Sequence, residues 1–136
     1  MLTSFLSTPI MNLDQEVFGF LILLACTLNF GFVIGEIDVP HQHSVYELFA
    51  AIVVNLIATA IKFGDRTQVG ALHLATSLVA DLQLIAASLV WWHATSISLE
   101  GMTPTITTMV VSLAAGALMA NLVSVILLIG ETLQHR

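Results

Sequence analysis

Polar positions divide the chain into four long apolar stretches. These stretches are Val17–Gly35, Glu47–Gly64, Val69–His93 and Thr105–Gly130. Each is long enough to cross the roughly 30 Å hydrocarbon core of a bilayer, which takes about 20 helical residues. Their apolar residues run continuously and do not alternate with polar ones, as they would in strands of a membrane barrel. The pattern therefore predicts an all-α integral membrane protein built as a four-helix transmembrane bundle.

The composition supports a membrane protein and excludes several other classes. Hydrophobic residues make up 57% of the 136 residues and charged residues only 9%, whereas soluble domains carry about 25% charged residues. Three basic residues against nine acidic ones exclude a nucleic-acid-binding protein, and a single cysteine excludes a disulfide scaffold. We expect no enzymatic activity and no cofactor, and the lipid bilayer itself is the expected partner.

The few basic residues predict the orientation of the bundle. Lys62 and Arg66 lie between the second and third stretches, and Arg136 ends the chain. In a four-span protein these positions fall on the same side, which is cytoplasmic by the positive-inside rule. We therefore expect both termini inside. Residues 1–16 are weakly amphipathic, and we interpret them as a short interfacial segment ahead of a transmembrane domain that covers residues 17–136.

The second and fourth stretches resemble each other. Residues 51–65 align without a gap on residues 117–131, which places Asn55 over Asn121 and Gly64 over Gly130. The first and third stretches align only faintly. A duplicated helical hairpin would produce this pattern, and so would chance similarity between apolar helices of few residue types.

Six of the polar side chains inside the stretches are the candidate residues of an ion path or a polar core. They are Asn29, Asn55, Thr59, Ser77, Asp81 and Asn121. Ser77 and Asp81 share one helical stripe with His73, because they are four residues apart. Asp81 is the most costly of them, at about 2.5–3.5 kcal/mol for a carboxylate at the centre of a membrane helix.

Two interpretations of these polar side chains stay open. In the first, asparagine and aspartate side chains form hydrogen bonds between helices and hold the bundle together. In the second, they line a hydrated path on which Asp81 binds a cation or a proton, because a carboxyl group at this depth usually marks such a pathway.

A second candidate cluster lies on the predicted outer face. It consists of acidic and histidine side chains in the first outer loop, together with one histidine at the end of the third stretch: Glu36, Asp38, His41, His43 and His93. Imidazole and carboxylate groups could hold a transition metal such as zinc, although the pattern does not identify the metal. The alternative is a solvated acidic loop, which would still concentrate cations near the surface.

Two segments carry a resemblance to a known family. VYELFAAIVVNLIATAIKFGDRTQ (45–68) and HLATSLVADLQLIAA (73–87), with MNL at 11–13, resemble a family of small, uncharacterised four-helix inner-membrane proteins of Gram-negative bacteria. The resemblance covers roughly residues 11–126. It implies the fold and a location in the bacterial inner membrane, and it implies no activity because the family is a domain of unknown function.

The sequence leads to two functional hypotheses. The first is a homo-oligomeric, cation-selective channel or transporter, with its path between subunits or through a loosely packed monomer. The second is a non-conducting accessory subunit that packs against a larger membrane protein, with the polar side chains serving as interhelical hydrogen bonds.

Overall fold

The chain forms four long helices within the part that the structure describes. The computed structural model describes residues 13–134. The long helices are α2 (Leu13–Val33), α3 (Val45–Lys62), α4 (Gln68–Ser96) and α5 (Pro104–Gln134), and the short 3₁₀ helix η1 covers Pro40–Gln42. Each of the four is long and apolar enough to cross a membrane. The predicted all-α bundle of four membrane-spanning helices is therefore confirmed.

Of the predicted interfacial segment, residues 13–16 form the first turn of α2. Residues 1–12 lie outside the described residues.

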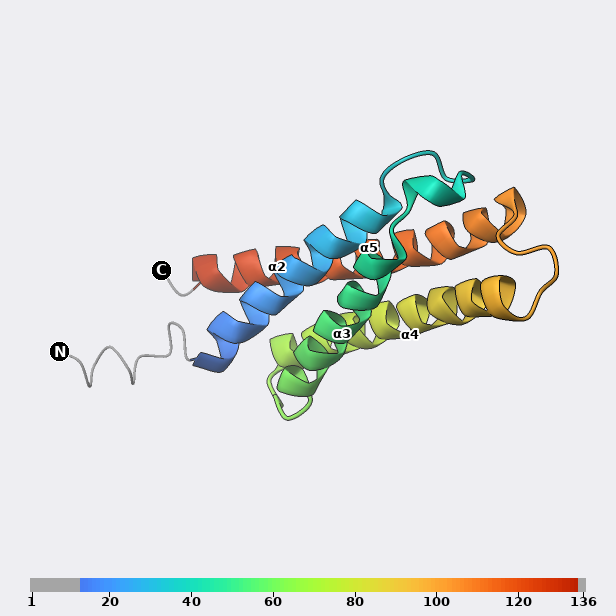
Figure 1. The fold of residues 1–136 in the computed structure, drawn as a ribbon. Coiled ribbons are helices and arrows are strands. Elements are labelled where there is room, and N and C mark those ends of the chain that lie inside the picture. Colours follow the sequence, from blue (N-terminus) through green and yellow to red (C-terminus); the bar gives the residue numbers. More distant parts are fainter. Residues whose placement is uncertain (1–12, 135–136) are drawn as a thin grey trace.

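The helices form a closed ring in which neighbours run antiparallel. Each helix packs against the helices before and after it along the chain, and α2 packs against α5 (Figure 1). The start of α2, the connection from α3 to α4 and the end of α5 lie together at one end, which we call the Lys62 end. The α2–α3 connection with η1 and the α4–α5 connection lie at the opposite end, which we call the Pro40 end.

Local sequence signals begin the last two helices. The hydroxyl of Thr67 accepts a hydrogen bond from the backbone N–H of Gly70 at 2.9 Å, which caps α4. Pro104 is the first residue of α5, where its missing N–H costs nothing, and the Thr103 hydroxyl accepts from the N–H of Ile106 at 3.1 Å. These caps fix the residues at which α4 and α5 begin. The connections that precede them are short, so the helices that they join run antiparallel.

The outside of the bundle is apolar and its inside is tightly packed with small side chains. Large apolar residues such as Phe20, Leu82 and Ile126 are about two-thirds exposed, at 65%, 69% and 66%. Alanines at the helix contacts are fully buried, among them Ala80 and Ala114. Because lipid tails are as apolar as leucine, small contact residues and close packing hold such helices together. The burial pattern is that of a bundle surrounded by lipid.

The interior holds two separate apolar clusters. The larger one, near the Pro40 end, consists of Phe32, Leu48, Ala51, Ala80, Leu84, Ala87, Val110, Val111, Ala114 and Ala117. The smaller one, near the Lys62 end, consists of Phe18, Ile22 and Ala58. Buried polar side chains lie between the two clusters along α2 and α3.

The close helix contact at Ala80 gives a test of the packing. We expect Ala80→Leu to lower the free energy of unfolding by about 1–3 kcal/mol, because a fully buried contact has no space for three more carbon atoms. Thermal unfolding in detergent, followed by circular dichroism, measures the effect. Ala75→Leu is the matched control, because Ala75 lies on the exposed face of the same helix. Equal melting temperatures for the two variants would contradict the packing described here.

Candidate functional site

The structure gathers all six candidate polar residues inside the bundle of one chain. Asn29, Asn55, Ser77 and Asn121 are fully buried, and Asp81 and Thr59 are 5% and 7% exposed. We call this set the polar belt. Along α2 Asn29 lies between Ile22 and Phe32, and along α3 Asn55 lies between Ala51 and Ala58, so these two asparagines lie between the two apolar clusters. Every long helix contributes at least one side chain to the polar belt.

Thr59 links α3 to α4 through Asp81. Its hydroxyl lies 2.5 Å from Oδ2 of Asp81 and 2.8 Å from the backbone carbonyl oxygen of Asn55. A threonine hydroxyl has one proton to donate. Both contacts are therefore hydrogen bonds at the same time only when Asp81 is protonated, donating to Thr59 while Thr59 donates to Asn55. The geometry fits a neutral carboxylic acid at Asp81.

Much of the polar belt has no hydrogen-bond partner within the described residues. Asn55 donates to the carbonyl of Ala51 on its own helix at 3.1 Å, but its Oδ1 has no partner. Both amide atoms of Asn29 and Asn121 are unpartnered, as are Ser77 Oγ and Asp81 Oδ1. A buried polar atom without a hydrogen bond costs about 1–3 kcal/mol. The hydrogen bonds between asparagines that a purely adhesive role predicts are not formed among residues 13–134.

A second polar network lies between the polar belt and the Lys62 end, centred on His73. The imidazole is fully buried, and Phe18 packs against it edge-on with ring centroids 4.8 Å apart. Its Nδ1 lies 2.7 Å from the hydroxyl oxygen of Ser124 on α5. Its Nε2 lies 3.7 Å from Oε1 of Glu131, which is within ion-pair distance if the imidazole is protonated. The other carboxylate oxygen of Glu131 accepts from the Gln15 amide at 3.4 Å.

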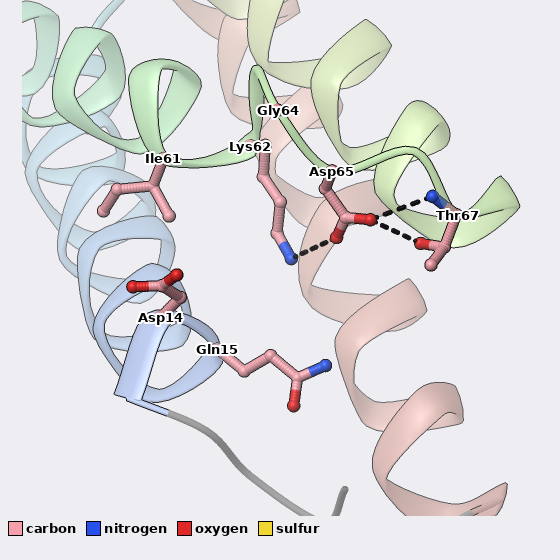
Figure 2. A pocket seen from close by; sticks show the side chains of 7 residues that line it. All are labelled: Asp14, Gln15, Ile61, Lys62, Gly64, Asp65 and Thr67. Carbon is pink, nitrogen blue, oxygen red and sulfur yellow. Dashed lines mark hydrogen bonds and ion pairs between the residues drawn. The ribbon is translucent and has the colours of Figure 1, made fainter.

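A cavity of about 450 Å³ lies at the Lys62 end. We call it the vestibule; its lining residues are Asp14, Gln15, Ile61, Lys62, Gly64, Asp65 and Thr67 (Figure 2). The Lys62 side chain is only 5% exposed, and its ammonium lies 3.4 Å from Oδ2 of Asp65 and 4.6 Å from the centroid of the Phe18 ring. Gln15 lines the vestibule and contacts Glu131, so the vestibule and the His73 network are neighbours.

Asp65 is held in its ionised form at the edge of the vestibule. Its Oδ1 accepts hydrogen bonds from the backbone N–H of Thr67 at 3.0 Å and from the Thr67 hydroxyl at 2.7 Å (Figure 2). The backbone hydrogen bond, aided by the hydroxyl and by the charge of Lys62, lowers the pKa of Asp65 below its ordinary value of 3.8 and outweighs the opposite effect of partial burial.

The structure does not gather the residues of the predicted cluster at the Pro40 end into one group. Within residues 13–134 no group of three or more His, Cys, Asp or Glu side chains could hold a metal ion. Glu36, Asp38, His41 and His93 are exposed. His43 instead anchors the loop, because its Nδ1 and Nε2 lie 2.6 Å and 2.7 Å from the carbonyl oxygens of Phe32 and Glu36. Both ring nitrogens therefore face backbone acceptors, and no lone pair points outward for a metal.

His73 shares the stripe of Asp81 but is not among the candidate residues predicted from the sequence, and neither are Ser124, Glu131 and Gln15. The stripe itself was the available signal for His73, which lies two helical turns from Asp81. Glu131 lies near His73 through the packing of α5 on α4. Gln15 reaches Glu131 because α2 packs against α5, and these two residues are 116 positions apart in the chain.

The hydrogen bond between Thr59 and Asp81 can be tested by its effect on stability. We expect Thr59→Val, which keeps the shape and removes the hydroxyl, to lower the free energy of unfolding by about 1–3 kcal/mol because Asp81 loses its partner. Thr132→Val is the control, since Thr132 bonds only a carbonyl on its own helix and is exposed. Chemical unfolding in detergent measures both; an equal, small loss would show that the contact contributes nothing.

Asp65 gives an acid-dependent prediction. Because the pKa is lowered in the folded protein, the stabilisation is complete above the ordinary value of 3.8 and is lost as the pH falls through the folded-state pKa. We expect Asp65→Asn to melt at a lower temperature than the wild type near neutral pH, with the difference shrinking in acid. Melting curves across this range check it. A difference that stays constant with pH would contradict an ionised Asp65.

Comparison with known protein families places most of the chain in a family. The chain matches the family described as Family of unknown function (DUF6394) over residues 42–132. The match covers all of α3 and α4 and most of α5, and therefore every polar-belt residue except Asn29. Comparison with curated proteins and with solved structures gives no match. The chain is a multi-pass membrane protein that belongs to the DUF6394 family of unknown function.

Proposed function

We propose that this protein is a small channel or transporter of the bacterial inner membrane that moves cations through the polar belt. The observation that carries the proposal is the set of buried polar atoms without partners in the middle of the bundle. Apolar residues of similar shape would be more stable at these positions, because each unmatched atom costs free energy. Polar side chains that face the interior of a membrane bundle usually mark ion or proton pathways.

The two ends of the polar belt differ in a way that favours alternating access over an open pore. Towards the Pro40 end, Phe32, Leu84 and Val110 belong to the larger apolar cluster and are at most 2% exposed. Towards the Lys62 end lie the His73 network and the vestibule. An apolar constriction excludes water and ions. A transported cation would therefore reach the polar belt from the Lys62 end and leave after the apolar cluster has rearranged.

The path we propose lies within each chain, because the polar belt faces the inside of the four-helix ring. We also expect, from the sequence, that the protein associates into a homo-oligomer. Each subunit would then carry its own path, and no path would form between subunits. The positive-inside rule would place the Lys62 end, with Lys62 and Arg66, on the cytoplasmic side.

Ion flux into liposomes tests the proposal. The full chain is reconstituted, and potassium, sodium and proton gradients are applied in turn, with empty liposomes as the baseline. We expect flux of at least one cation, and we expect Asp81→Asn to reduce it at least about tenfold, which corresponds to about 1.4 kcal/mol in the barrier. Glu100→Gln makes the same carboxylate-to-amide change on an exposed residue at the Pro40 end and should leave the flux unchanged.

Absence of any cation flux from folded wild-type protein would overturn the proposal. In that case the unpartnered polar atoms would favour an accessory subunit, and co-purification with a larger membrane protein would be the next measurement. Equal flux in the wild type and Asp81→Asn would leave a transport protein whose path avoids Asp81.

A further inference from the structure

We infer that the transported cation is a proton and that it reaches Asp81 from the Lys62 end by way of Glu131 and His73. This inference rests on the proposed function and names its substrate and route. It rests on the positions of three groups between the vestibule and the polar belt, Glu131, His73 and Ser124, and of Ser77 in the polar belt itself.

The two nitrogens of His73 face different surroundings. Nε2 faces the carboxylate of Glu131 at 3.7 Å, on the side of the Lys62 end. Nδ1 lies 2.7 Å from the hydroxyl of Ser124, whose residue lies one helical turn from Asn121 in the polar belt. A histidine held in this way can take up a proton on one nitrogen and release one from the other, which is the requirement for a proton shuttle. A histidine that only held helices together would need no more than the hydrogen bond to Ser124.

Glu131 connects His73 to water. Its side chain is 18% exposed, and it accepts a hydrogen bond from Gln15, which lines the vestibule of about 450 Å³. Solvent protons can therefore reach the carboxylate without passing through the apolar interior.

The route continues on α4 at intervals that a single water molecule could bridge. Ser77 and Asp81 follow His73 at four-residue steps on the same buried stripe, or about 6 Å per step along the helix axis. One water with hydrogen bonds of about 2.8 Å on each side spans a similar distance. Ser77 Oγ and Asp81 Oδ1 are both buried and unpartnered, so each has an atom available to such a water.

The packing around this route favours a proton over a metal cation. Phe18, Ile22 and Ala58 are fully buried in the apolar cluster at the same end of the bundle. A metal cation crossing this part would need a wide passage lined by several oxygen ligands, whereas a proton passes between hydrogen-bonded groups that stay in place. The contacts of Thr59 also fit an Asp81 that carries a proton.

Each proton transfer forms one bond and breaks another. A solvent proton forms an O–H bond on Glu131; the carboxyl group then closes from 3.7 Å to hydrogen-bonding distance of Nε2, and the O–H bond breaks as neutral His73 is protonated. The imidazolium releases its Nδ1 proton to the Ser124 hydroxyl, which passes its own proton on through water and Ser77 to the carboxylate of Asp81. This leaves His73 as its Nε2–H tautomer, and exchange of that proton through water restores the Nδ1–H tautomer before the next transfer. The charged groups that face His73 are Glu131 from α5, Lys62 from α3 and Asp65 from the α3–α4 connection, and α2 presents Phe18.

Proton flux into liposomes that enclose a pH-sensitive dye tests the inference, with potassium and sodium flux measured on the same preparations. We expect His73→Gln to reduce proton flux at least about tenfold, because glutamine keeps a hydrogen bond to Ser124 but cannot carry a proton. His93→Gln is the control: it makes the same change on the exposed Pro40 end of the same helix and should leave the flux unchanged. Size-exclusion profiles and helix content establish that each variant is folded.

Glu131→Gln is a second variant, which tests the inference if His73→Gln does not fold. Glu131 lies near the end of α5, and we expect its replacement to slow proton flux severalfold as well. Potassium or sodium flux that depends on Asp81 but not on His73 or Glu131 would overturn this inference and leave the proposed function standing. Proton flux that is unaffected by both variants would overturn the route. No flux of any cation from the wild type would overturn both proposals.

Discussion

The structure depends on one constraint: polar side chains inside a bilayer must be kept away from the lipid. The chain meets this by turning its polar side chains inward and its large apolar ones outward. Phe20 and Leu82 face outward, while Asn29 and Asn121 are fully buried. The ring of four antiparallel helices follows, because it is the arrangement in which every helix can place its polar stripe away from lipid.

The same constraint makes the polar belt informative. Inside a bundle, asparagine side chains that only held helices together would be paired across helix contacts. Here hydrogen bonds between helices join Thr59 to Asp81, Ser124 to His73 and Thr76, and Gln15 to Glu131, while the amides of Asn29 and Asn121 have no partner among the described residues. The bundle therefore contains more buried polar groups than the hydrogen bonds between its helices require. Water or a transported ion would supply partners for the remaining polar atoms, because water forms hydrogen bonds and an ion interacts through its charge.

The sequence predicted the fold well because its signals are local. Continuous apolar stretches identify membrane helices without any knowledge of their neighbours, and the polar residues near their centres had to face inward. The predicted duplication stays a prediction, although Asn55 and Asn121 are equally buried at their aligned positions. What the sequence could not predict is which side chains from distant helices meet. Glu131 reaches His73, and Gln15 reaches Glu131, only through packing of α5 on its neighbours. The side chains of the predicted outer cluster are not gathered for a related reason, because the two ring nitrogens of His43 lie against the backbone carbonyl oxygens of Phe32 and Glu36.

The asymmetry between the two ends links the fold to the proposed transport. The chain of polar groups from Glu131 through His73 reaches the polar belt from one side, and the larger apolar cluster closes the other side. If a path were permanently open at both ends it would dissipate the gradients across the membrane, so a closed apolar end is what a regulated path requires. That cluster combines alanines such as Ala87 and Ala114 with larger side chains such as Phe32 and Leu84. Because it closes the Pro40 side of the polar belt, the Pro40 end is the part of the bundle where opening would have to occur.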